Sequence, residues 1–339
     1  MLPGRPKTLL VCLFLLTSIL SGVEAQSNST TAGTDNAPGF VNGERVIGGF
    51  IPKHWASIIG VVLYAASAAI HWLHWFRMGK RHMLVLTIGM TCMALGFVFR
   101  IIYANNPSSL GLYILMTMFI LLSPCAFLAT DYVLLEHLAE NLGHDVANSC
   151  LFLSSSLIVK IFVGADIATF LIQAGGGGLQ ASKDVHMSDL GSKVAIVGLV
   201  IQLISFGLFT CLLLVFGFRV RTSYPERWRV NRHGQTIWST AGLFKTTDAY
   251  DWRILFVLLC ISCVCILIRS VFRILEYAEG YYGHLATHEG YFYLLDALPL
   301  WIAMSQFCFF WPTRFRPYQP YEKRGEHVPL DQYRSSNSV

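Results

Sequence analysis

The sequence IRSVFRILEYAEGYYGHLATHEGYFYLLDALP occupies residues 268–299 and begins inside a long apolar segment. That segment nevertheless contains Arg269, Arg273 and Glu276. Steps of four and three residues return to nearly the same side of a helix, so these residues form one charged stripe. Charged side chains are costly inside a membrane-spanning helix. The stripe therefore predicts a buried site with partners on other helices.

The overall composition predicts an all-α membrane protein. Of the 339 residues, 54% are hydrophobic and only 13% are charged, whereas soluble domains have about 25% charged residues. The apolar residues come in runs of roughly 20, the length of helix that crosses the hydrocarbon core of a bilayer. The formal net charge of +5 is too small to indicate a nucleic-acid partner.

Seven apolar segments predict a bundle of seven transmembrane helices with the N-terminus outside and the C-terminus in the cytoplasm. The orientation follows from the positive-inside rule. The loop of residues 219–252 carries six basic residues and the tail of residues 313–339 carries five, against four on the whole predicted outer side. The predicted spans are residues 55–76, 83–103, 110–135, 151–174, 193–218, 253–275 and 291–311, within a transmembrane domain of residues 55–312.

The N-terminal region has the pattern of a secreted leader. In residues 1–25, Arg5 and Lys7 precede a short apolar core and small residues before a predicted cleavage site, which indicates a signal peptide. An uncleaved anchor is the alternative. Residues 26–54 are predicted to form a polar extracellular or lumenal tail, in which Asn28 begins a glycosylation sequon.

With this topology, polar residues from five predicted spans lie at similar depth in the outer half of the membrane. Three arginines face three acidic residues, which predicts a buried network of ion pairs and hydrogen bonds. Arginine binds phosphate or carboxylate through two parallel hydrogen bonds, so the network fits an anionic or zwitterionic head group of an amphipathic substrate. The alternative is a network that only holds the helices together. The predicted members are Arg100, Asp166, Gln173, Gln202, Arg269, Arg273, Glu276 and Asp296.

Other polar residues in the predicted spans give weaker signals. Lys160 faces away from Asp166 and is expected either to snorkel toward the inner surface or to pair with Asp131. His71 and His74 share one helix face and are interpreted as a packed pair. The cysteines of CISCVC lie in an apolar run without a nearby His or Asp, so neither a metal site nor a cofactor is predicted.

A glycine run, AGGGGL, occupies residues 174–179 at the predicted end of the fourth span. It has neither a preceding strand nor a following Lys and Ser or Thr, which excludes a phosphate-binding loop. The run predicts a tight exit from the helix or an unwound helix end. Unwound backbone at membrane depth is tolerated only against protein or a water-filled cavity, and broken helices are typical of transport sites.

Four motifs resemble those of the fungal lipid-translocating exporter family, which comprises seven-helix proteins of the aminocholesterol-resistance and long-chain-base-resistance type. Met93 stands where relatives commonly have Glu, which removes an expected partner of Arg100. The resemblance implies that the eight members of the predicted polar network are motif positions, together with Gly176, Gly177, Gly178, His288 and Glu289. The motifs are DIATFLIQAGGGGL at 166–179, VGLVIQLISF at 197–206, RSVFRILEYAEG at 269–280 and HEGYFYLLDALP at 288–299.

The resemblance implies a fungal protein of the plasma membrane, or of the vacuole or another endomembrane, that exports or flips amphipathic lipids and confers resistance to them. Sphingoid bases, sterol-like compounds and porphyrin-like compounds are the implied substrates. The alternative function is a seven-helix sensor or regulator of lipid asymmetry or of a stress response, with a cytoplasmic protein docked at residues 219–252. An enzyme is not predicted, because the spans contain no His cluster, no nucleophile–base pair and no cofactor signature.

Overall fold

The structure is a computed structural model, and the part of the chain that it describes contains the complete helical bundle. The predicted signal peptide, Asn28 and most of the tail after residue 313 lie outside the described residues, as do residues 229–239 of the predicted docking loop. The described residues are 40–41, 44–45, 52–79, 81–151, 154–180, 185–228, 240–243, 247–280, 285 and 288–315.

Seven of the described helical segments are long and apolar enough to cross a membrane, which confirms the predicted class and number of spans. Shorter elements flank them: a hairpin of β1 (Phe40–Val41) and β2 (Glu44–Arg45), then η2 (Arg81–Met83), α5 (His144–Cys150), α8 (Pro225–Trp228) and η4 (Pro312–Arg314). The spans are α2 (His54–Met78), α3 (Leu84–Asn105), α4 (Leu110–Leu142), α6 (Ser155–Gln180), α7 (Val185–Ser223), α10 (Trp252–Glu279), and a composite of α12 (Glu289–Tyr291), η3 (Phe292–Ala297) and α13 (Leu298–Phe309).

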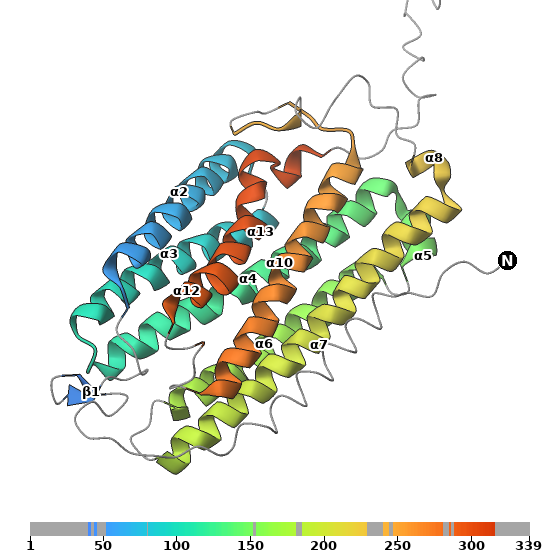
Figure 1. Ribbon diagram of the computed structural model, residues 1–339. Helices are drawn as coiled ribbons and strands as arrows, with labels where there is room; N and C mark the ends of the chain where they lie inside the picture. Colours follow the sequence, from blue (N-terminus) through green and yellow to red (C-terminus); the bar gives the residue numbers. More distant parts are fainter. Residues whose placement is uncertain are drawn as a thin grey trace, which may run out of the picture.

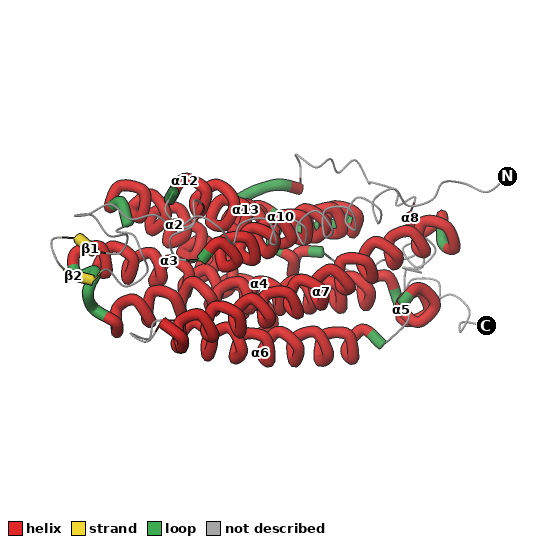
Figure 2. Tube along the Cα trace, turned by 60° about the horizontal axis from the view of Figure 1, so that its bottom comes forward, coloured by secondary structure: helices red, strands yellow, loops and turns green. Residues whose placement is uncertain are grey.

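The long helices run along one axis, and each packs against the next in the chain until α13 returns to α2 (Figures 1 and 2). α4 also packs against α10 and so lies inside this ring. Successive helices alternate in direction. We call the end where α3, α6 and α10 finish and α12 begins the Glu289 end, and the opposite end, where α10 begins, the Trp252 end.

The exterior of the bundle is apolar, as lipid contact requires. Large hydrophobic side chains on every long helix are exposed, whereas aromatic side chains such as Phe97, Phe127 and Phe209 are fully buried between helices. Three helices extend at least six residues further than the sequence predicted: α4 continues to Leu142, α6 continues to Gln180, and α7 begins at Val185. In the added part of α4, Leu138 and Leu142 are buried four residues apart while Glu140 is exposed, a pattern typical of a helix that is packed on one side only.

The glycine run is helical, so the prediction of an unwound helix end was wrong. α6 continues through the glycines to Gln180. A Cβ atom on Gly176 would lie 2.6 Å from the backbone nitrogen of Ala195, and one on Gly191 would overlap the backbone nitrogen of Gln180. Small residues that let two helix backbones approach are typical of packing in membranes. Gly176 and Gly191 therefore serve the contact between α6 and α7.

The last span contains a π-helical segment, η3, directly before Pro299. Proline has no backbone N–H, so Pro299 cannot donate the helical hydrogen bond to the carbonyl four residues earlier. The hydroxyl of Tyr64 on α2 donates to the carbonyl oxygen of Ala297 at 2.7 Å, which ties the segment to a neighbouring helix. π-Helical segments frequently occur at functional sites, and this one carries Asp296.

Candidate functional site

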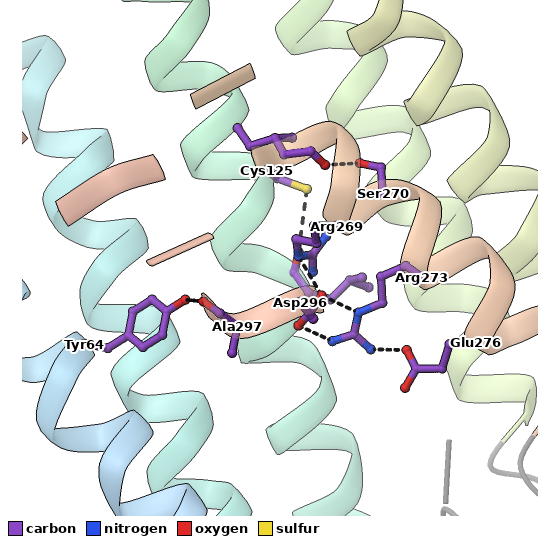
Figure 3. A network of polar contacts seen from close by, with 10 residues as sticks. Tyr64, Cys125, Arg269, Ser270, Arg273, Glu276, Asp296 and Ala297 are labelled. Atoms are coloured by element: carbon purple, nitrogen blue, oxygen red, sulfur yellow. Dashed lines mark hydrogen bonds and ion pairs between the residues drawn. The ribbon is translucent and has the colours of Figure 1, made fainter. Parts of the chain in front are cut away.

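Asp296 is the centre of a buried polar network (Figure 3). Its carboxylate accepts two parallel hydrogen bonds from Arg273, Nε to Oδ1 and Nη2 to Oδ2, each 2.8 Å long. Nε of Arg269 lies 2.9 Å from Oδ1 of Asp296 and forms a second ion pair, without hydrogen-bond geometry. Asp296 is fully buried and Arg269 nearly so. Each charge offsets the desolvation of the others, which is the condition under which buried charges are tolerated.

Glu276 adds a second negative charge. Nη1 of Arg273 donates to its Oε2 at 2.9 Å, and the two side chains are 13% and 16% exposed. The fork of Arg273 thus joins Asp296 to Glu276, and two arginines are balanced by two carboxylates. The structure brings together all three residues of the charged stripe on α10: Asp296 lies between Arg269 and Arg273, and Glu276 lies on the other side of Arg273 (Figure 3).

Arg100 pairs with Glu289, a partner that counting the charges within the predicted spans missed. Nη2 of Arg100 donates to Oε1 of Glu289 at 3.0 Å, and the side chains are 3% and 9% exposed. The guanidinium carbon also lies 4.4 Å from the ring centroid of Phe292, a cation–π distance. Arg100 thus has a carboxylate partner from the start of the last span, although Met93 stands where relatives commonly have Glu. Met93 itself is a fully buried part of the apolar core.

Asp166 stands apart from the ion pairs, contrary to the predicted balance of three acids against three arginines. Its Oδ2 accepts a hydrogen bond of 2.8 Å from the hydroxyl of Tyr132 on α4. The two predicted glutamines meet each other: Nε2 of Gln173 donates to Oε1 of Gln202 at 2.9 Å, and Gln202 in turn contacts Sγ of Cys125 at 3.8 Å. Tyr132 was missed; its only signal is a tyrosine next to Asp131 in an apolar run.

The structure does not contain the predicted pairing of Lys160 with Asp131. Lys160 is exposed on α6. Asp131 is fully buried and accepts a hydrogen bond of 2.7 Å from the hydroxyl of Ser262 on α10. Asp131 and Lys160 sit on helices that pack together, but depth and spacing alone did not show that Asp131 faces α10 rather than α6.

A partly open pocket lies beside the network and has an empty volume of about 370 Å³, part of it open to the surroundings. It lies between α4, α6, α7 and α10 toward the Glu289 end. Its lining combines polar groups with aliphatic side chains, which makes the pocket amphipathic. Its lining residues are Thr117, Ile120, Leu121, Gln173, Ala195, Leu199, Arg269, Arg273 and Tyr277.

The remaining predicted positions lie outside this pocket. Gly177 and Gly178 are inside α6 with open space at their Cβ positions. His288 is exposed directly before α12. His71 and His74 are buried against Trp311, and Nε2 of His74 lies 2.9 Å from the carbonyl oxygen of Cys308. Among the described residues, no group of three or more His, Cys, Asp or Glu side chains is arranged to hold a metal ion.

Comparisons with known proteins agree on one family. Residues 86–319 match the family model described as RTA1 like protein. The chain is 30% identical over 217 residues to protein RTA1 and 28% identical over 212 residues to protein RTM1, both of Saccharomyces cerevisiae; the matches cover 64% and 62% of this chain and 61% of each relative. The chain thus spans about three fifths of the length of these curated relatives.

A longer match, 26% identical over 313 residues, covers 85% of this chain and 78% of the sphingoid long-chain base transporter RSB1 of S. cerevisiae. Protoporphyrin uptake protein 1 of the same yeast is 27% identical over 214 residues, which cover 63% of each chain. These relatives bear the names of transport and uptake proteins. No solved structure matches the chain. Because the family model matches more than half of its length, the chain belongs to the RTA1-like family of multi-pass membrane proteins.

Proposed function

We propose that this protein moves amphipathic lipids between the two faces of a membrane and so confers resistance to toxic ones. The pocket beside Arg269 and Arg273 is the observation that carries the proposal. The pocket is open to the surroundings, so a molecule whose head group entered it would keep its apolar body outside the pocket. The pocket combines charged and amide groups with Ile120 and Leu121, which suits a molecule with a polar head and an apolar body.

The arginines in the pocket differ in how many of their donors are in use. Arg273 donates through all three of its nitrogens, to Asp296 and Glu276. Arg269 is held near Asp296 by charge, while its Nε makes no hydrogen bond to a described residue. Arg269 and Gln173 both line the pocket, so a phosphate, carboxylate or hydroxyl of a head group would meet these two residues there. Arg273 would hold the carboxylates of Asp296 and Glu276 in position beside the pocket.

The names of the relatives support a substrate class. One relative is named as a sphingoid long-chain base transporter and another as a protoporphyrin uptake protein. Both named substrates have an apolar body with polar groups at one end. We extend this class to the present chain: sphingoid bases, sterol-like compounds and porphyrin-like compounds. The proposed activity is transport without bond breaking. It is placed in the plasma membrane, or in the vacuole or another endomembrane, with the Glu289 end outside and the Trp252 end in the cytoplasm.

The decisive experiment measures lipid movement in liposomes that contain only the purified full-length protein. Fluorescent sphingosine and fluorescent phosphatidylcholine are added to the outer leaflet, and dithionite quenching reports the fraction that remains outside. We expect the protein to accelerate movement of at least one probe well above the protein-free rate. The proposal fails if neither probe moves faster with folded protein present; a role as a sensor or regulator that docks a partner at residues 219–252 would then be the remaining function.

A matched pair of variants ties the activity to the pocket. Leu121 lines the pocket, whereas the next residue, Leu122, is 40% exposed on the outside of the bundle. Leu121→Trp fills the pocket and is expected to reduce lipid movement to the protein-free rate. Leu122→Trp adds the same volume on the lipid side and is expected to leave movement unchanged. Equal activity of the two variants would place the transport path elsewhere.

A further inference from the structure

Two buried carboxyl groups near the middle of the bundle belong neither to the pocket nor to the ion-paired network. Asp131 on α4 is 0% exposed and Asp166 on α6 is 2% exposed. Each accepts one hydroxyl hydrogen bond through Oδ2, from Ser262 and Tyr132 respectively. Oδ1 of each has no hydrogen-bond partner among the described residues. Asp166 lies near the centre of α6, and Tyr132, the residue after Asp131, reaches it from α4. Coupling-ion sites of transporters occur near the middle of the membrane.

The surroundings of the two carboxyls contain no compensating cation. Among the described residues, neither Asp131 nor Asp166 forms an ion pair with Arg, Lys or His. By contrast, the buried carboxylates of Asp296 and Glu289 each form an ion pair with an arginine. An isolated buried carboxylate is so costly that the group takes up a proton or a cation instead. This contrast separates the two mid-bundle carboxyls from the ion-paired network.

The other titratable groups close to the two carboxyls are neutral residues. Tyr132 on α4 interacts electrostatically with both carboxyls, Cys263 and Cys265 on α10 interact with Asp131, and Cys125 on α4 interacts with Asp166. Neighbouring residues of a helix point about 100° apart. Asp131 therefore faces α10, while the adjacent Tyr132 reaches α6 and Asp166. One turn of α4 thus connects both carboxyls.

Polar groups continue from this level to the pocket. Cys125 contacts Nε2 of Gln202, and Gln202 accepts from Gln173, which lines the pocket beside Arg269. Along α10, Ser262 and Arg269 are separated by about 10 Å at 1.5 Å per residue. The carboxyls are thus near enough to the pocket for one helix movement to affect both, yet they touch none of its lining residues through a hydrogen bond in the part of the chain that the structure describes.

We propose that Asp131 and Asp166 bind the protons that couple lipid movement to a proton gradient. A carboxylate takes one proton from one side of the membrane to form a neutral carboxylic acid, and it releases the same proton to the other side. One unit of positive charge crosses the membrane for each proton, and no bond other than O–H forms or breaks. Because both groups are fully buried, exchange requires helix movement, the step that alternating access provides. The claim that the protons drive lipid movement rests on the proposed function. The claim that Asp131 and Asp166 bind protons does not.

The coupling part is tested with fluorescent sphingosine in proteoliposomes under a gradient of one pH unit, with potassium and valinomycin clamping the membrane potential. At equilibrium, one proton per lipid supports an enrichment of about tenfold in one leaflet and two protons about a hundredfold. The enrichment should reverse with the gradient, after subtraction of the passive response of protein-free vesicles. Asp131→Asn and Asp166→Asn each remove one proton site, so each should lower the enrichment by about tenfold relative to the wild-type protein. Asp189→Asn, which changes an exposed residue paired with Lys193, is the control.

Two results would overturn the coupling. An enrichment by the Asn variants equal to that of the wild-type protein would show that the carboxyls carry no coupled proton. Enrichment driven by a sodium gradient at equal pH would assign the site to an alkali cation instead. Asp131→Glu and Asp166→Glu retain a titratable group and are expected to recover part of the response, which distinguishes proton binding from a purely structural role.

The proton sites have a test that does not need transport. Infrared spectra of the full-length protein in lipid should contain the carbonyl stretch of buried carboxylic acids, and this band should decrease reversibly as the pH is raised. Asp131→Asn and Asp166→Asn should each remove part of the band, whereas Asp189→Asn should not. A band that does not change with pH would mean permanently protonated groups and would exclude these carboxyls as coupling sites. If the wild-type protein moves no lipid, the proposed function fails while this titration still decides the assignment.

Discussion

Arg100 and Glu289 stand 189 positions apart in the sequence, and their side chains meet at 3.0 Å. The same carboxylate accepts hydrogen bonds of 3.1 and 3.0 Å from the backbone nitrogen of Lys53, directly before α2. Glu289 thus joins the start of the first span, the end of α3 and the start of the last span. The ion pair closes the ring of helices at the Glu289 end, next to the Asp296 network.

Neutralising Glu289 should therefore destabilise the bundle. Glu289→Gln leaves Arg100 buried without this carboxylate, and loss of one partner of a buried ion pair costs about 3–5 kcal/mol. Thermal unfolding in detergent, followed by a thiol-reactive dye that reaches the buried Cys92 and Cys263 only on unfolding, measures the effect. Asp189→Asn removes an exposed ion pair and should cost less than about 1 kcal/mol. Equal unfolding temperatures for the two variants would refute the role of Glu289.

Arg273→Ala should abolish resistance while the protein remains in the membrane. The substitution removes three hydrogen bonds of the site, but Arg269 still balances Asp296. Growth of fungal cells on a toxic sphingoid base measures function, and immunoblots of the membrane fraction measure folded protein. Arg253→Ala, on the same helix at the Trp252 end, removes a partly exposed ion pair with Asp251 and should leave growth unchanged. Disappearance of the Arg273→Ala protein from the membrane would instead assign the network to helix assembly.

Helix periodicity and depth located most of the polar network, because both depend only on position along a regular helix. They grouped Arg269, Arg273 and Glu276 and placed Asp296 at the same level. Choosing which acid meets which arginine needs the rotation of each helix about its axis. Asp166 turns toward Tyr132, and Glu289 lies just outside the span that was counted, so the predicted charge balance had the right number of acids and one wrong member.

The π-helical segment and the glycine contact could not be predicted from the sequence, because neither hydropathy nor helix propensity reports on them. A hydropathy pattern is almost the same for an α-helical and a π-helical segment, so Pro299 was the only signal of η3. Four consecutive glycines indicate weak helix propensity, and the prediction of an unwound end followed from it. Tertiary packing overrides propensity here, because Gly176 allows α7 to approach the backbone of α6.

Tyr132→Phe and Asp166→Ala should be energetically coupled, because each change removes one partner of the same hydrogen bond. The hydroxyl of Tyr132 donates to Asp166 at 2.8 Å in a fully buried place. Double-mutant cycles on hydrogen bonds between membrane helices give about 0.6 kcal/mol on average and at most about 1.7 kcal/mol. We expect a coupling in this range from the unfolding temperatures of the two single variants and the double variant. Strictly additive effects would show that the hydrogen bond does not form in the membrane.

The contact between α6 and α7 gives the sharpest test of the packing, because two adjacent glycines differ in their surroundings. A Cβ atom at Gly176 would lie 2.6 Å from the backbone nitrogen of Ala195, whereas one at Gly177 would have nothing within 4 Å. Gly176→Ala should therefore separate the helices and destabilise the protein by about 1–3 kcal/mol, the usual cost of overpacking. Gly177→Ala should stabilise it by up to about 1 kcal/mol, since alanine is the better helix former. Thermal unfolding in the same detergent compares the two variants directly. If both raise the unfolding temperature, the glycine run is a flexible helix end and the close approach of α6 and α7 is wrong. The two variants are expected to change stability in opposite directions because Gly176 faces the backbone of α7 and Gly177 does not.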